Sequence, residues 1–303
     1  MAKPALDERA IEQETRALLK RAGTKGRWPT PVEEIVEAAG LVEPGESLLS
    51  PSVIEQAPPH IRLAMRRISG KIRAVLDRKT REIHVDPSIH NVGRANFKRL
   101  HEVGHHTCYW QTDDAYADSD ATTSPYIKNL VEQEANVAAS NLLFQLEYFD
   151  ILARDYEIGS SSIQDIADII VASYHATFRR YVRRHDAVIA GVVLDISPCA
   201  VSPVGYSRNE VVISENWQEE FGAALWPKVL RTEPYSFVDE ARQARTAPGV
   251  IHTEFAFPNL RNESVSLKVD LYCNQHKIFA LIWRPRREIL KRRRIIVPSS
   301  ISA

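Results

Sequence analysis

The clearest chemistry in this sequence lies in the five residues His101, Glu102, Val103, Gly104 and His105, which form the pattern HExxH. At 3.6 residues per turn the two histidines of such a helix share one face, about 6 Å apart, where both imidazoles can bind one zinc ion. Glu102 lies one step round the helix, where its carboxylate can take a proton from a water on that ion. The pattern predicts a zinc site that hydrolyses amides without a covalent intermediate.

A catalytic zinc ion held by two histidines and a water needs a third protein ligand. The next predicted helix contains the segment VEQEAN, in which Glu132 and Asn136 are spaced i, i+4 and share one face. Glu132 is therefore predicted as the third ligand, and Asn136 as an amide that steadies a histidine. Glu134 lies about 200° round the helix and is the weaker candidate. Tyr126 and Tyr109 are candidates for stabilising the oxyanion only because they are near in sequence.

The same residues also have an ordinary structural interpretation. Taken singly, His101 and His105 could be partly buried helix residues, and Glu132 and Glu134 a solvated helical face. Two histidines at helical spacing, together with a carboxylate on the following helix, favour the metal site over that interpretation.

Four further residues are not favoured as parts of the site. His106 and Cys108 point away from the ligand face of the helix and are predicted to pack or to lie at the surface. His84 and His90 precede the helix and are weaker candidates still.

Several elements must position these residues, and hydrophobic spacing and chain breakers outline them. Two N-terminal helices, the second ending at Gly40, are followed by a predicted loop and by a pair of short strands. Two long helices then carry the candidate site, and a third helical stretch follows. The ranges are 6–22 and 32–40 for the first helices, 43–59 for the loop, 72–77 and 81–85 for the strands, and 93–110, 127–149 and 160–185 for the later helices.

Beyond Asp186 the pattern changes to short strands, at residues 187–196, 210–214, 264–272 and 277–283. A domain boundary is therefore predicted near His185. Residues 1–185 are expected to form a mainly helical, zincin-like peptidase domain with a small β-sheet. Residues 186–303 are expected to form a separate α/β or mixed-β domain, so the predicted fold class is α+β.

The composition limits which classes of partner and which cellular compartment are expected. Lys plus Arg and Asp plus Glu both number 39, so no global field favours nucleic acid or an anionic membrane. Cys108, Cys199 and Cys273 form no CxxC pair, which argues against a disulfide framework. The sequence shows neither the apolar stretch of a signal peptide nor a run of about 18 apolar residues. We expect a cytoplasmic protein with no membrane partner.

The order of these motifs resembles the ImmA/IrrE family of metallopeptidases over roughly residues 10–182. The matching segments are Pro31 with Glu34 and Ile35, IHVD at 83–86, Arg94 and Phe97 before HEVGH, Glu132–Asn136, and Leu142 with Leu143. In the family the two motif histidines and the Glu of ExxAN bind zinc, which the resemblance carries onto His101, His105 and Glu132. The chain departs from the family pattern at Lys98, Arg99 and Leu100, where Thr-Leu-Ala is common, and at Phe144 and Gln145, where Met-Pro is common.

The resemblance implies an intracellular zinc endopeptidase that cleaves a helix-turn-helix transcriptional repressor and so derepresses a stress or mobile-element response. It also implies a helix-turn-helix-like end to the first domain at about 155–185, although helices that merely pack on the core fit the segment Ile163–Tyr181 equally well. By analogy, residues 186–303 would regulate the peptidase or dock its substrate.

Two other functions stay open at the level of sequence. A zinc-containing regulator could bind DNA or a partner without hydrolysis, through residues 161–182 and the basic run 284–294, although such runs are usually solvated. A toxin or antitoxin component is a third hypothesis. Nucleic acid is therefore possible as a partner but is not favoured.

Overall fold

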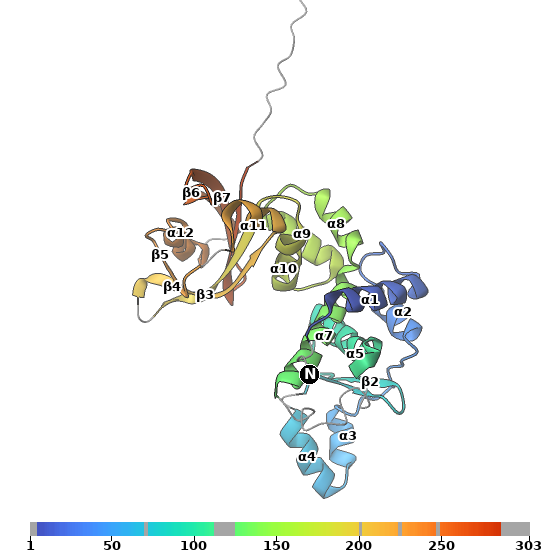
Figure 1. Ribbon diagram of the computed structural model, residues 1–303. Helices are drawn as coiled ribbons and strands as arrows, with labels where there is room; N and C mark the ends of the chain where they lie inside the picture. The colour runs from blue at the N-terminus through green and yellow to red at the C-terminus, as the bar shows by residue number, and fades with distance from the viewer. Residues whose placement is uncertain are drawn as a thin grey trace, which may run out of the picture. The chain divides into compact units, whose positions relative to one another are not determined.

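The computed structural model describes residues 5–69, 72–111, 125–199, 202–223, 226–246 and 249–285. In these ranges the chain forms eleven α-helices and eight β-strands, so the predicted α+β class is confirmed (Figure 1). The chain divides into two compact units, residues 1–186 and 187–303, and each is described by itself. Among the described helices, none combines the length and the apolar character that crossing a membrane requires.

The first unit is mainly helical, with one two-stranded sheet. Its elements are α1 (Glu8–Ala22), α2 (Val32–Ala38), α3 (Pro51–Gln56), α4 (Pro59–Ser69), β1 (Ala74–Asp77), β2 (Glu82–Val85), α5 (Val92–Thr107), the 3₁₀ helix η1 (Tyr109–Gln111), α7 (Pro125–Phe144), α8 (Glu147–Arg154), α9 (Ser160–Ile170) and α10 (Tyr174–Arg184).

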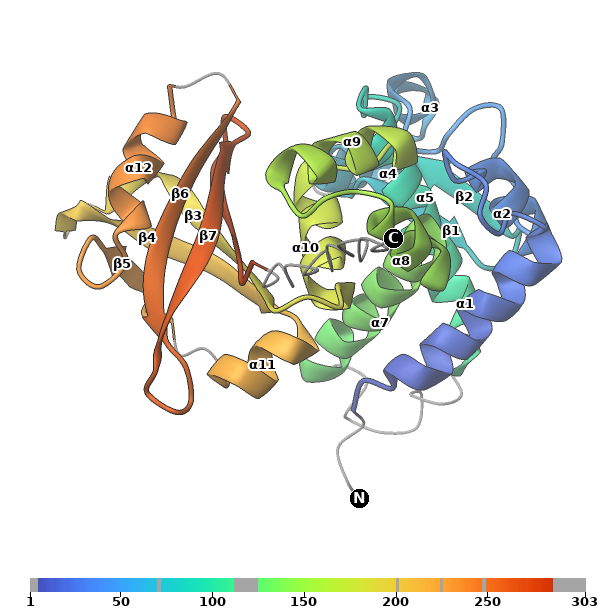
Figure 2. The ribbon, with the colours of Figure 1, turned by 90° about the horizontal axis from the view of Figure 1, so that it is seen from above.

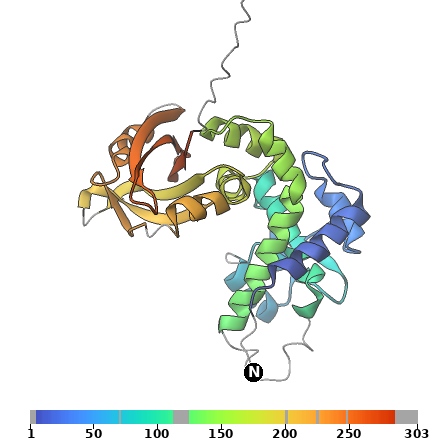
Figure 3. The same ribbon diagram turned by 45° about the horizontal axis from the view of Figure 1, so that its top comes forward.

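Helices α5 and α7 form the centre of this unit, and the long α7 is seen along its length in Figure 3. The side chain of Asn91 accepts a hydrogen bond from Arg94 N and so caps the start of α5. Gly104 lies against α7 so closely that a Cβ atom there would be 2.8 Å from the carbonyl oxygen of Ala135. The glycine of HEVGH therefore permits the close approach of the two helices that carry the candidate site.

The predicted pair of short strands forms the antiparallel hairpin β1–β2, with Ala74 opposite Val85 and Asp77 opposite Glu82. Oδ1 of Asp77 accepts hydrogen bonds from the backbone N–H groups of Lys79, at 2.8 Å, and Thr80, at 3.2 Å, which closes the turn. Strand β1 packs beside α5. The hairpin thus borders the helix that carries HExxH.

The predicted helix 127–149 is wrong at its C-terminal end, because α7 stops at Phe144. Gln145 and Leu146 have left-handed φ angles of 51° and 54°, and α8 begins after them. The buried amide of Gln145 accepts a hydrogen bond from Gly26 N at 2.6 Å and donates to the carbonyl of Arg27 at 2.8 Å. These tertiary bonds stabilise a break that helical spacing alone does not reveal.

The loop predicted at 43–59 and the single helical stretch predicted at 160–185 are also revised. Helix α3 lies inside the loop, where the hydroxyl of Ser50 accepts a hydrogen bond from Val53 N and Pro51 occupies the first turn. The later stretch is two helices, α9 and α10, because Val171 adopts a left-handed φ of 59° and Ser173 caps α10.

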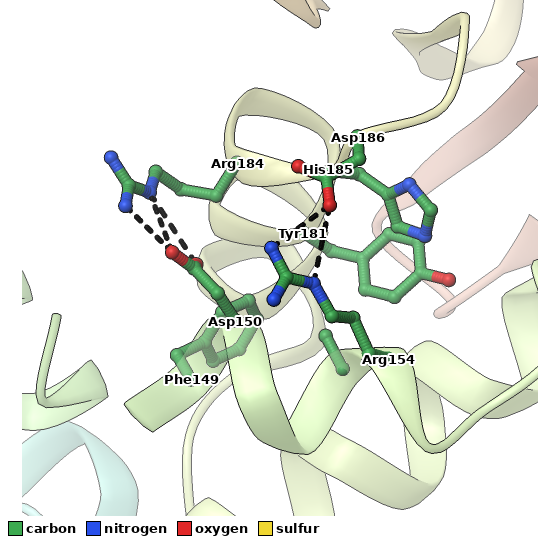
Figure 4. A pocket seen from close by; sticks show the side chains of 8 residues that line it. Phe149, Asp150, Arg154, Tyr181, Arg184, His185 and Asp186 are labelled. Atoms are coloured by element: carbon green, nitrogen blue, oxygen red, sulfur yellow. Dashed lines mark hydrogen bonds and ion pairs between the residues drawn. The ribbon is translucent and has the colours of Figure 1, made fainter. Parts of the chain in front are cut away.

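Two ion pairs at the C-terminal end of this unit surround a small hollow of about 10 Å³ (Figure 4). Arg184 on α10 binds Asp150 on α8 at 2.6 Å, and Arg154 on α8 binds Asp186 at 2.9 Å. Tyr181 lies beside them. A hollow of this size holds about one water molecule, so the cluster fastens helices together and does not form a ligand site.

The second unit is a curled, six-stranded antiparallel sheet in the order β5-β4-β3-β8-β7-β6 (Figure 2). Its elements are β3 (Ile189–Cys199), β4 (Ser202–Ile213), α11 (Glu215–Phe221), β5 (Val229–Arg231), α12 (Phe237–Ala244), β6 (Val250–Pro258), β7 (Ser264–Cys273) and β8 (Lys277–Trp283). The predicted hairpin around residues 273–276 is confirmed as the β7–β8 pair. Every strand pair in this sheet is antiparallel. Of the two folds predicted for the second domain, α/β or mixed-β, the α/β fold is therefore wrong, and the described residues form an antiparallel sheet with two helices.

The core of the second unit is apolar and rich in aromatic rings. Helix α12 buries Phe237, Val238 and Ala241 in the cluster that the sheet residues also form. Trp217 on α11 is fully buried in the same cluster, with its ring 4.5 Å from that of Phe221.

Candidate metal centre

The structure brings His101 and His105 on α5 together with Glu132 on α7. The two Nε2 atoms lie 3.2 Å apart. The carboxylate oxygens of Glu132 lie 3.3 Å from His101 Nε2 and 3.6 Å from His105 Nε2. One donor atom from each residue lies within 4.8 Å of the others, so the three could hold a metal ion.

These separations fit the edges of a zinc coordination tetrahedron. Zinc–nitrogen and zinc–oxygen bonds of about 2.0–2.2 Å at tetrahedral angles place neighbouring donor atoms about 3.3–3.6 Å apart. The three measured separations, 3.2, 3.3 and 3.6 Å, lie at or close to that range. Two imidazoles and one carboxylate also form a known catalytic donor set that leaves a position for water or substrate.

The outer nitrogens of both imidazoles face amide oxygens. His101 Nδ1 lies 3.1 Å from Asn136 Oδ1, and His105 Nδ1 lies 2.9 Å from Gln111 Oε1. An amide oxygen only accepts, so each Nδ1 must donate, and each neutral ring is left with a bare lone pair on Nε2. Two lone pairs and a carboxylate then face one another, an arrangement that a cation stabilises.

The charges at the site suit this arrangement. Burial, more than any other effect, lowers the pKa of His105 and so favours its neutral form. The contact with His101 is the main cause that lowers the pKa of Glu132, whose side chain is 59% exposed. At neutral pH the site therefore offers neutral imidazole and an anionic carboxylate.

Glu102 lies beside this group and is only 7% exposed. Burial raises the pKa of its carboxyl group, and the nearby charge of Glu132 adds to the increase, whereas His101 acts in the opposite direction. A backbone hydrogen bond from Leu76 in β1 also reaches this carboxylate. Glu102 is therefore a buried acid next to the donor set and outside it.

Glu134 is outside the group of three donors, but it is not a solvated residue. It is 3% exposed and accepts hydrogen bonds from Gln111 Nε2 at 2.8 Å and Trp110 Nε1 at 3.1 Å. Sequence reasoning did not identify Gln111 or Trp110. Both lie in the short 3₁₀ helix η1, where no periodic pattern indicates which way a side chain points.

The two tyrosines suggested for oxyanion stabilisation are both on the surface. Tyr126 lies in the first turn of α7 and is 46% exposed. Tyr109 lies in η1, is 64% exposed, and has its ring against that of Trp110. Their role stays a prediction.

The remaining candidates lie apart from the donor set. His84 is buried in β2, where Nδ1 accepts a hydrogen bond from Leu48 N at 3.2 Å, and His90 is exposed before α5. Cys108 is fully buried against Ile11 and Ala138, and His106 is half-buried. The basic run 284–294 lies outside the described residues from position 286 onward.

Comparison with known proteins identifies no family. No family model matches the sequence, and no curated protein does. Among solved structures, a Mycobacterium tuberculosis transcriptional regulator matches with a TM-score of 0.51 and 10% identity, over 91% of this chain and 77% of that chain. At this identity the likeness is one of fold.

Proposed function

We propose that this chain is a zinc-dependent endopeptidase in which His101, His105 and Glu132 hold the ion and Glu102 is the general base. The observation that carries the proposal is the tetrahedral spacing of three donor atoms, 3.2–3.6 Å apart, beside a buried carboxylate that is not one of them. A zinc site that only stabilises a fold has no need of that fourth, desolvated acid.

When bound, zinc supplies a Lewis acid that polarises the scissile carbonyl and lowers the pKa of a coordinated water. Glu102 accepts the proton of the attacking water and returns it to the leaving amine nitrogen. Because burial raises its pKa, the carboxylate is a stronger base than an exposed glutamate. His101 and His105 would remain ligands throughout, each oriented by the amide oxygen at its Nδ1.

Strand β1 offers a binding mode for a peptide substrate. Among the described residues it pairs only with β2, which leaves its other edge without a strand. An extended peptide can add to such an edge through backbone hydrogen bonds. Leu76 of β1 contacts the Glu102 carboxylate, so this edge lies beside the proposed base.

The proposed substrate is a helix-turn-helix repressor whose cleavage derepresses a stress or mobile-element response in the cytoplasm. The resemblance to the ImmA/IrrE family motivates this choice. The regulator named among the structural matches is compatible with a role in gene control.

A regulator that binds without hydrolysis is the second candidate, and the geometry of α9 and α10 favours it. A turn of three residues, 171–173, joins the two helices, and such a connection is typical of helix-turn-helix motifs. In this alternative the zinc site would hold the first unit together, and Glu102 would be dispensable for function.

Glu102→Gln separates the two candidates. The amide keeps the shape of the side chain but cannot accept the proton, so cleavage should slow by about 10²- to 10⁴-fold while zinc is retained. The substrate to test is any helix-turn-helix protein that proves to be encoded beside the gene, digested in vitro and followed by mass spectrometry. Gln133→Ala, an exposed change on α7, is the control. A Glu102→Gln protein that cuts at the wild-type rate would exclude the peptidase mechanism.

The ligand set has its own test in zinc content. His101→Ala removes a donor and should lower zinc affinity by more than the roughly 10- to 100-fold that changes outside the donor set cost. His106→Ala, on the same helix but outside the donor set, should leave it unchanged. Full zinc occupancy in His101→Ala would contradict the assignment.

A further inference from the structure

A buried polar chain links His105 to residues outside the donor set. Gln111 is 7% exposed, and its Oε1 lies 2.9 Å from His105 Nδ1. Its Nε2 donates to Glu134 Oε2 at 2.8 Å and to the backbone carbonyl of Val131 at 3.3 Å. Trp110 Nε1 donates to the same carboxylate oxygen of Glu134 at 3.1 Å. Both polar atoms of the Gln111 amide thus have partners, and both partners of its nitrogen are acceptors.

The character of these partners leaves one orientation for the amide. Glu134 Oε2 already accepts from the indole N–H of Trp110, and the Val131 carbonyl can only accept, so the NH₂ group of Gln111 must face both. A flipped amide would place its oxygen against two acceptors and would lose both hydrogen bonds in a buried site. Oε1 must therefore face His105, and His105 Nδ1 must carry the proton.

The two ligand histidines differ in this respect. Asn136, the partner of His101, is exposed and lies on the same helix as Glu132, and within the described part of the chain no second side chain forms a hydrogen bond with its amide. Gln111 is buried, comes from η1, and is itself held by Glu134. Hydrogen bonds in a buried network orient their members more strongly than exposed ones do.

We propose that Gln111 and Glu134 are positioning residues for His105: Glu134 fixes the Gln111 amide, which holds His105 in the Nδ1–H tautomer with Nε2 directed at the metal position. This inference rests on the proposed metal site and assigns a role to two residues outside its donor set. Without the hydrogen bonds of Gln111 and Glu134, His105 is free to adopt the other tautomer, whose Nε2–H cannot bind a metal.

The first test is zinc affinity, measured by competition with a chromogenic chelator. Gln111→Leu should weaken zinc binding by about 10- to 100-fold, the range for partners of metal-bound histidines. Glu134→Leu should weaken it by a smaller factor in the same direction, since Gln111 remains but loses its anchor. Gln133→Leu, the exposed neighbour of Glu134 on α7, should leave it unchanged. Wild-type affinity in Gln111→Leu would overturn the proposal.

The second test removes the polar groups of the amide and keeps the shape of the side chain. Methionine is close to glutamine in length, but in Gln111→Met the side chain can neither accept a normal hydrogen bond from His105 nor donate one to Glu134. Zinc affinity should therefore fall about as far as in Gln111→Leu. Wild-type affinity in Gln111→Met would show that packing alone matters and would overturn the tautomer mechanism.

The third test reads the tautomer directly in the metal-free protein. Long-range ¹H–¹⁵N spectra of histidine-labelled protein should show His105 protonated on Nδ1 in the wild type and in the control Gln133→Leu. In Gln111→Leu the Nε2–H form should appear. An unchanged tautomer in Gln111→Leu would overturn the proposal even if the chain proves to be a peptidase. Conversely, a Glu102→Gln protein that still cuts would exclude the proposed peptidase mechanism, but the tautomer measurement would still test the role of Gln111.

Discussion

The two units of the chain both have apolar cores but differ in how many polar side chains they bury. Among the described residues, fourteen buried polar or charged side chains belong to the first unit, and only Ser214 and Asp270 belong to the second. The buried groups of the second unit are instead a cluster of aliphatic and aromatic residues around the sheet. Burying polar groups costs free energy unless each is paired. The first unit therefore carries the larger share of buried polar groups, of which some cap helices or stabilise loops and others form the candidate site.

The location of the buried polar groups supports this interpretation. His101, Glu102, Gln111 and Glu134 all lie at or next to the α5–α7 contact. Each histidine and amide there has a partner, whereas Glu102 is a carboxylate that burial pushes toward its neutral form. A fold selected only for stability would replace such a group with an apolar one. The two units should therefore respond differently to substitution, in the free energy of unfolding and in zinc affinity.

The largest expected effect on stability is in the second unit. Trp217→Ala removes a fully buried indole from the aromatic cluster and should destabilise this unit by about 3–5 kcal/mol. Trp217→Phe keeps a ring in the cluster and removes an indole N–H that has no hydrogen-bond partner among the described residues, so it should cost less. Denaturant unfolding of the full chain measures both changes.

Zinc affinity of the same variants sharpens the comparison. If the second unit is a separate apolar body, Trp217→Ala should leave zinc affinity unchanged under conditions where the first unit stays folded. A parallel loss of zinc would show that the two units fold as one.

A smaller effect is expected at the helix contact of the first unit. In Gly104→Ala the new methyl group would lie 2.8 Å from the carbonyl oxygen of Ala135 and 3.1 Å from the side chain of Ala138, so α5 and α7 must separate. Overpacking of this kind costs about 1–3 kcal/mol, and the shift should also weaken zinc binding because Glu132 moves away from the histidines. Gly45→Ala, where a Cβ atom meets nothing within 4 Å, is the matched control and should be neutral. Equal zinc affinity in the two variants would argue against a close helix contact.

Much of the candidate site follows from helical spacing alone. His101 and His105 are one turn apart on one helix, and Glu132 and Asn136 are one turn apart on the next, so spacing places each pair on one face. The structure brings these four side chains together. The HExxH pattern also places Glu102 beside the ligands. Gln111 could not be found this way, because it lies in a single 3₁₀ turn after the helix.

The limits of the fold prediction have similar causes. The β1–β2 hairpin and the β7–β8 pair follow from alternating side chains and short polar turns. The end of α7 does not, because the bonds of the Gln145 amide to the N-terminal loop stabilise the break. Strands β5 and β6 and helices α11 and α12 were not predicted, since their short segments pack by contacts distant in sequence.

The smallest expected effect is the pH dependence that Glu102 imposes on the metal-free protein. Burial raises the pKa of its carboxyl group above the ordinary value of 4.5, so the folded state holds this proton more tightly than the unfolded chain. As pH rises from the ordinary value through the raised one, the folded state retains more protons and the free energy of unfolding falls. The contribution of Glu102 to the free energy of unfolding is thus fully present below pH 4.5 and is lost as the pH rises toward neutrality. Glu102→Gln cannot ionise and escapes this loss.

The metal-free Glu102→Gln protein should therefore melt close to the wild type near pH 4 and above it near pH 7, with a gap that widens between these values. Thermal unfolding of both proteins in a chelating buffer across that range measures the gap. Carboxylates with lowered pKa values, such as Asp86 and Glu147, make stability fall at acidic pH, but they are present in both proteins and largely cancel in the difference. If the wild type were the more stable protein at neutral pH, the Glu102 carboxylate would stabilise the fold, and its burial would not be a cost. The contrast between a costly polar centre and an apolar second unit would then lose its main example.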